Sequence, residues 1–184
     1  MQTRKTTAVI APIETPMRFL DLIEWEELTG ASRLRIGARR PVETLGRLMP
    51  MLQPPLAMIY VLVVARAGRP AGRYRSPPIA THAELQRLLD GFCRFFEGDA
   101  RHHLWVVPAQ GTTALVLDRH GMLFAYGDLP AYERTLARHS FTQGRVHVPT
   151  NHSHCFDPAM NELETELMEL WPWQRSPLRD GDAD

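Results

Sequence analysis

Residues 102–126, HHLWVVPAQGTTALVLDRHGMLFAY, determine the fold that we expect for this chain. The stretch holds three runs of apolar and β-branched residues, the composition that is typical of strands. Gly111 separates the first run from the second, and residues 118–121 (DRHG) have the composition of a tight turn before the third. The pattern predicts an antiparallel meander. Its three strands are expected at about residues 102–107, 112–117 and 122–126.

The middle run of this meander requires cover on both of its faces. In a strand Ala114 and Val116 point to one side, while Leu115 and Leu117 point to the other. Because both sets are apolar, helices or a partner must cover both faces.

The surrounding sequence predicts helices that can supply this cover. The best-defined helix covers residues 82–97, because Thr81 and Glu84 have the capping-box spacing and apolar residues follow a helical period up to Gly98. The acidic stretch 17–28 follows a roughly helical period as well, so we expect a second helix there. Further helices are expected after Pro41, Asp128 and Asp157, and further strands at residues 33–36, 56–66 and 145–148.

Length and composition favour one folded domain. The chain has 184 residues, of which 44% are hydrophobic and 23% charged, as in ordinary globular proteins. We therefore expect a single α+β domain over residues 17–173, with an antiparallel sheet of four to five strands and helices packed mainly on one face. Residues 1–16 are expected to form a flexible tail or an edge strand. Residues 174–184 are expected to form a flexible polar tail.

Charge and cysteine content point to a bacterial cytoplasmic protein. Twenty-one basic residues balance twenty-one acidic ones, which removes the global positive field that drives nucleic-acid binding. All basic residues except Lys5 are arginine, a bias that indicates a GC-rich bacterial genome. The two cysteines indicate no disulfide framework, so a reducing compartment fits. The longest apolar run, residues 56–65, is too short to span a membrane.

The strongest concentration of metal-ligating residue types is His147, His152, His154 and Cys155. If the loop is extended, His152 and His154 point to one side and Cys155 points to the other, so only two ligands converge. The spacing matches neither a zinc finger nor a metalloprotease helix. Polar loop residues that surround a helix start would explain the same pattern. We expect no cofactor, and a metal-dependent hydrolase that uses His152 and His154 is the alternative hypothesis.

Asp118 and His120 could form a dyad in which a carboxylate orients an imidazole for general base catalysis. A hairpin turn needs the same residue types at the same positions, and we favour that interpretation. The sequence also has no nucleophile elbow, no phosphate-binding loop, no dinucleotide fingerprint and no Cys-x-x-Cys pair. The sequence therefore favours a function without catalysis.

The best candidate contact surface consists of Arg66, Arg69, Arg73, Tyr74 and Arg75 in a Gly- and Pro-rich segment that we expect to be a surface loop. Arginine and tyrosine are enriched at binding hot spots, and guanidinium groups suit carboxylates or phosphates. Charges that only solvate a loop would explain the segment as well. A carboxylate-bearing protein suits it better than a nucleic acid, because four arginines on a neutral chain bind phosphates weakly.

A second basic stretch, Arg33, Arg35, Arg39 and Arg40, directly follows the acidic residues 21–27, and we expect the two stretches to pair. The favoured function is a non-enzymatic protein-interaction module, such as an immunity-type or regulatory protein that covers a partner protein. A binder of phosphates or nucleic acid through the segment from Arg66 to Arg75 is a further alternative.

Overall fold

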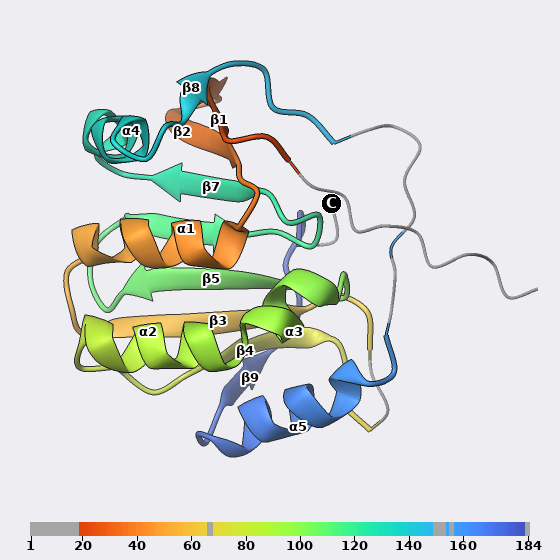
Figure 1. Ribbon diagram of the computed structural model, residues 1–184. Helices are drawn as coiled ribbons and strands as arrows, with labels where there is room; N and C mark the ends of the chain where they lie inside the picture. Colours follow the sequence, from red (N-terminus) through yellow and green to blue (C-terminus); the bar gives the residue numbers. More distant parts are fainter. Residues whose placement is uncertain (1–18, 66–67, 149–153, 155–156, 183–184) are drawn as a thin grey trace, which may run out of the picture.

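The structure is a computed structural model that describes residues 19–65, 68–148, 154 and 157–182. Its centre is one nine-stranded sheet with the order β8-β1-β2-β7-β6-β5-β3-β4-β9, shown in Figure 1. The strands are β1 (Leu22–Leu28), β2 (Ala31–Gly37), β3 (Leu56–Leu62), β4 (Gly72–Arg75), β5 (His102–Pro108), β6 (Ala114–Leu117), β7 (Leu123–Tyr126), β8 (Thr142–Gln143) and β9 (Gln174–Ser176). The helices are α1 (Pro41–Leu48), η1 (Met49–Met51), α2 (His82–Gly91), α3 (Cys93–Gly98), α4 (Leu129–Ala137) and α5 (Met160–Glu169).

The fold is α+β, but the expected sheet of four to five antiparallel strands is wrong. The sheet is mixed, because β8 runs parallel to β1 while the other neighbouring strands are antiparallel. The additional strands are short or lie in segments that we interpreted as helix, loop or tail. Such strands owe their stability to pairing with neighbours, so their own sequences carry a weak signal. The predicted meander is confirmed as β5, β6 and β7.

The predicted helix at residues 17–28 is wrong, because residues 22–28 form β1. Strands β1 and β2 make a hairpin through Gly30, which has a φ of +80° that few other residues adopt readily. In this register Glu24 lies opposite Arg35 and Glu26 lies opposite Arg33. The acidic and basic stretches therefore attract each other across two strands, an arrangement that local periodicity does not reveal.

The predicted helix over residues 82–97 divides into α2 and α3 at Phe92, which has a non-helical ψ of 13°. Thr81 caps α2 as expected, because its side chain accepts a hydrogen bond from the Glu84 backbone N–H. Phe95 and Phe96 are buried, whereas Phe92 is half-buried against the core.

The structure describes the C-terminal segment up to residue 182 but not the first 18 residues of the chain. The expected tail or edge strand at residues 1–16 lies outside the described residues. Residues 174–176, which we expected in a polar tail, instead form β9 and pair with β4. Further along, Asp182 is buried. None of the helices in the described part of the chain is long and apolar enough to cross a membrane.

One face of the sheet carries the core. The buried apolar side chains of the strands and of all five α-helices form a single cluster, so the helices pack on one face of the sheet. Figure 1 shows α1, α2 and α3 in front of that face. We call the opposite side the outer face, and its residues are those that alternate with the core positions along each strand.

Candidate functional site

The outer face has an ordered row of side chains that crosses the sheet at right angles to the strands. Each member lies directly opposite the next in the strand register. Four apolar residues form its centre, and an arginine stands at each end of that apolar part. In order across eight strands, the row is Glu24, Arg35, Phe124, Val116, Trp105, Ile59, Arg75 and Gln174.

Arginines next to the row cover its two aromatic rings. The guanidinium carbon of Arg33 lies 4.1 Å from the centre of the Phe124 ring. The guanidinium carbon of Arg73 lies 4.8 Å from the centre of the Trp105 ring. These distances are those of cation–π contacts, which leave both rings half-buried. The apolar centre is therefore shielded by charged groups that keep it compatible with water.

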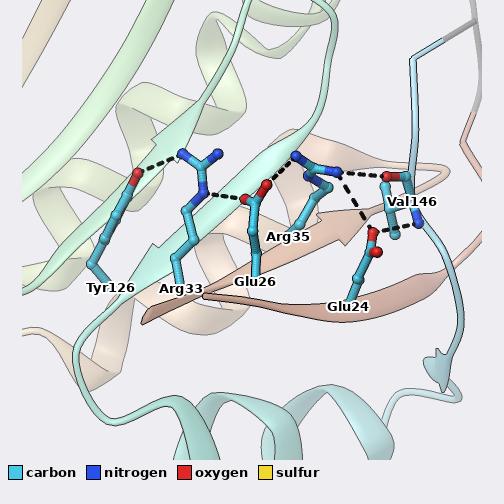
Figure 2. Close-up of polar contacts among 6 residues, drawn as sticks. All are labelled: Glu24, Glu26, Arg33, Arg35, Tyr126 and Val146. Carbon is cyan, nitrogen blue, oxygen red and sulfur yellow. Dashed lines mark hydrogen bonds and ion pairs between the residues drawn. The ribbon is translucent and has the colours of Figure 1, made fainter. Parts of the chain in front are cut away.

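Carboxylates from β1 hold the arginines of β2 in place (Figure 2). Glu26 accepts hydrogen bonds from both Arg33 and Arg35, and Arg33 Nη1 donates to the Tyr126 hydroxyl at 2.8 Å. Arg35 also lies 3.7 Å from Glu24. Burial lowers the pKa of Arg33, but its hydrogen bonds to Glu26 and Tyr126 outweigh that effect and raise it. The expected pairing between the basic stretch and the acidic stretch is confirmed.

Figure 2 also shows that the backbone of Val146 docks on this cluster. Its N–H donates to Glu24 Oε2 at 2.9 Å, and its carbonyl accepts from Arg35 Nη1 at 3.2 Å. The two side chains thus satisfy the backbone groups that a neighbouring strand would satisfy. Residues 145–148, for which we expected a strand, form none, and Val146 is held by these side chains instead. Strand β8 lies just before them at residues 142–143.

At the other end of the sheet, a buried carboxylate holds Arg73. Arg73 Nε and Nη2 donate to the two carboxylate oxygens of Asp182 at 2.8 and 2.7 Å. The Arg179 backbone N–H donates to the same carboxylate at 2.7 Å. Burial would raise the pKa of Asp182, but the hydrogen bonds from Arg73 and from the Arg179 backbone lower it on balance. The bidentate pair fastens residues 179–182 onto the outer face.

His103 on β5 supports the same contact in its neutral form. Because a carbonyl oxygen can only accept, His103 Nε2 donates its proton to the Asp182 carbonyl at 3.0 Å. His103 Nδ1 then accepts from the Arg119 backbone N–H at 3.3 Å. Burial of the imidazole lowers the pKa of His103. With these two hydrogen bonds both ring nitrogens of His103 have partners, and its role is to hold the Asp182 backbone and the Arg119 backbone.

The structure builds most of the predicted contact loop into the sheet. Tyr74 is buried, faces the core, and donates its hydroxyl proton to the Pro70 carbonyl at 2.6 Å. Arg73 is 9% exposed and is engaged by Asp182. Both side chains are buried and hydrogen-bonded within the folded chain. They are therefore not displayed on a surface loop.

The remaining residues of the predicted loop differ in their availability. Arg69 Nε lies 3.7 Å from a carboxylate oxygen of Glu164 on α5. Arg66 lies outside the described residues. Arg75 is half-buried at the end of the outer-face row, and its guanidinium group has no hydrogen bond or ion pair with any described residue. Of the described arginines in this segment, Arg75 is thus the one that can receive a ligand.

Arg75 lines a shallow pocket of about 350 Å³ on the outer face. Ala57 and Gln174 belong to the same face and line the pocket beside it. Much of the remaining wall is proline, from Pro77, Pro78 and Pro172. Because Pro172 belongs to this wall, the segment after α5 helps to shape the pocket.

The structure brings together two histidines that we had assigned to separate candidate sites. The ring centres of His120 and His154 lie 5.0 Å apart. His120 Nδ1 lies 2.9 Å from Asp118 Oδ2, so the predicted dyad contact exists. Asp118 also accepts the backbone N–H groups of His120 and Met122, so the predicted turn chemistry is confirmed as well.

The predicted metal ligands are only partly described. His147 is exposed, whereas His152 and Cys155 lie outside the described residues. Within the described part of the chain, no group of three or more His, Cys, Asp or Glu side chains could hold a metal ion. The described contacts around His120 include its ring contact with His154 and its 2.9 Å contact with Asp118.

No family model, no curated protein and no solved structure matches the chain.

Three features of the candidate site on the outer face were not predicted from the sequence. Trp105 lies at the centre of the row. The alternation of residues within β5 could have predicted the face to which Trp105 points, but not which residues of the adjacent strands lie beside it. The acidic and basic alternation on either side of Gly30 could have revealed the β1–β2 hairpin. For Asp182 the sequence carried no signal, because its partner Arg73 lies 109 residues away.

Proposed function

We propose that the protein is a non-enzymatic interaction module that binds a partner protein with the outer face of its sheet. The observation that supports the proposal most strongly is the cross-strand row, in which Phe124, Val116, Trp105 and Ile59 lead to the half-buried guanidinium of Arg75. From β2 to β4 the row crosses five strand spacings, or about 24 Å at about 4.8 Å each. That length, with an apolar centre and a charged end, is suited to a protein surface.

Charge complementarity favours a carboxylate-bearing protein over a nucleic acid. On this face Glu24 and Glu26 pair with the arginines of β2. Asp182 pairs with Arg73 on β4. Arg75 is the group that they leave without a counter-charge among the described residues. A polyanion that crosses this face would meet carboxylates toward both ends and apolar groups at the centre, whereas a protein can place one acidic group at Arg75 and apolar groups along the row.

The proposal includes a setting and a mode of action. An immunity-type or regulatory protein acts by covering its partner, and a broad sheet face is suited to that action. The arginine-rich composition and the low cysteine content support action in the bacterial cytoplasm.

The test is a pair of equivalent substitutions on the two faces of the sheet. Trp105→Leu removes the central ring of the row, whereas Trp25→Leu removes a tryptophan that is 42% exposed and points to the helix side, toward Glu133. The partner is captured from cell extract, identified and purified, and its Kd is measured by calorimetry. We expect Trp105→Leu to weaken binding at least 10-fold, or about 1.4 kcal/mol, while Trp25→Leu changes it less than twofold.

Three results would contradict the proposal. The purified candidate does not bind, or both tryptophan variants bind it equally well, or both lose binding equally. Circular dichroism verifies that each variant is folded, and Ile59→Thr provides a second probe of the same row. Turnover of a phosphoester or amide panel that is lost in His154→Ala would favour the hydrolase alternative instead. Co-purification of nucleic acid would favour the phosphate-binding alternative.

A further inference from the structure

We infer that the pocket around Arg75 is a receptor site for an aspartate or glutamate side chain of the partner, an inference that rests on the proposed function. The guanidinium of Arg75 is half-buried and has no polar partner among the described residues. A partly desolvated cation without a counter-ion is unfavourable, so a carboxylate that reaches it gains a charge-assisted hydrogen bond.

The chain itself shows how a carboxylate binds on this strand. Arg73 lies two residues before Arg75, so both side chains point to the outer face of β4. Arg73 donates to both carboxylate oxygens of Asp182, with donor–acceptor distances of 2.8 and 2.7 Å. A segment that crosses the face can therefore place an aspartate on an arginine of β4. The same geometry is available at Arg75 to a segment of another protein.

The lining of the pocket specifies an anionic group next to an apolar one. No acidic side chain lines it among the described residues. Gln174 lies directly opposite Arg75 in the strand register, and its side-chain amide makes no hydrogen bond to a described residue, so it can act as a second donor. Ser76 is already engaged, because its hydroxyl accepts from the Met58 N–H and donates to the Pro77 carbonyl.

The set of donors in the pocket favours a carboxylate over a phosphate. One guanidinium fork can bind two oxygens of either group. A phosphate carries more charge and a third strong acceptor oxygen, and the prolines of this wall have no N–H to offer it. The proline surface suits the apolar side chain of a residue next to the aspartate or glutamate.

A random peptide library displayed on phage tests the inference without a known partner. The library is selected on the full chain, on Arg75→Gln and on Arg87→Gln, a matched control that is exposed on α2 at the opposite side of the sheet. We expect the wild-type protein and Arg87→Gln to enrich an acidic residue beside an apolar one. Arg75→Gln should lose that enrichment, and Arg75→Glu should enrich a basic residue instead.

The best peptide then enters a double-mutant cycle. Arg75→Gln on the protein and acid-to-amide replacement on the peptide should each weaken binding about 10-fold, and the two changes together should cost no more than either one. The inference would be overturned if the library yields no peptide, or yields peptides without an acidic position. It would also be overturned if the losses in the cycle are additive, or if inorganic phosphate displaces the peptide more effectively than acetate does. If those results occur while Trp105→Leu still weakens partner binding at least 10-fold, the inference fails and the proposed function stands.

Discussion

On β2, core residues and charged residues alternate at neighbouring positions, so one strand serves two different environments. Leu34 and Ile36 are fully buried under the helices, whereas Arg33 and Arg35 face outward and pair with glutamates of β1. The same division holds on β4, where Tyr74 is in the core and Arg73 is held by Asp182. The comparison shows that the helix face is stabilised by apolar burial, and the outer face by cations that cover aromatic rings.

This difference has a consequence for function. Apolar burial is non-directional and leaves no polar group without a partner. A network of charges leaves a group unpaired wherever its cations and anions are unequal in number. On the outer face the inequality falls at Arg75. This inequality is the reason for which we propose the outer face as the binding face.

The largest expected effect is on the helix face. Phe95 is completely buried, so Phe95→Ala should lower the free energy of unfolding by about 3–5 kcal/mol. Phe92→Ala is the matched control, and it should cost clearly less because Phe92 is half-buried where α2 ends. Urea unfolding followed by circular dichroism measures both. Equal losses would mean that the division of the predicted 82–97 helix has no energetic significance.

A smaller effect is expected where the outer face holds residues 179–182. Asp182→Asn replaces the charged acceptor of Arg73 and should cost about 2 kcal/mol, since hydrogen bonds to charged groups are worth about 1.5–3 kcal/mol. Asp180→Asn is the control, because that residue is exposed. The measurement is urea unfolding of both variants. A neutral Asp182→Asn would show that the bidentate pair adds nothing to the stability of the outer face.

The smallest effect is the pH dependence that His103 on the outer face contributes. The pKa of His103 is lowered in the folded protein by burial, whereas in the unfolded chain it is about 6.5. Below that pH the unfolded chain binds the extra proton, so the free energy of unfolding should fall as the pH decreases from 7 to 5. The slope contributed by one such group is at most about 1.4 kcal/mol per pH unit.

The variant His103→Gln isolates this contribution, because glutamine can still donate to the Asp182 carbonyl and accept from the Arg119 N–H. The slope of stability against pH should become shallower in His103→Gln and stay unchanged in His139→Gln, whose side chain is exposed. An unchanged slope in both variants would show that protonation of His103 has no cost in the folded state. The lowered pKa of Asp182 stabilises the folded protein at neutral pH, and this contribution changes with pH only below about pH 5. The titrations of His103 and Asp182 therefore fall in different pH ranges.

Several elements could be predicted because their signals are local. The meander of β5, β6 and β7 follows from alternating apolar residues and the turn at residues 118–121. The N-terminus of α2 follows from Thr81 and Glu84, three residues apart. Turn and cap chemistry involves residues that are close in sequence whatever the rest of the chain does, so the residues themselves are sufficient evidence.

The residues 17–28 show where local evidence ends. Their apolar positions fit a helix approximately, and Ile23 and Trp25 alternating with Glu24 and Glu26 fit a strand equally well. The pairing of the two glutamates with arginines of β2 decides in favour of the strand. A preference of a few tenths of a kcal/mol per residue for either structure is smaller than the combined effect of those pairs and of burying Ile23.

By itself the sequence determined the α+β class and the central meander, and it predicted a contact segment that contains both Arg73 and Arg75. It could not determine which of the two arginines is available. Arg73 and Arg75 are chemically alike and two residues apart, and the difference between them is that Asp182, 109 residues from Arg73, reaches one and not the other. Contacts at that separation depend on the order and register of all nine strands together. No local preference encodes them, because each forms only after the whole sheet has brought its two partners within hydrogen-bonding distance.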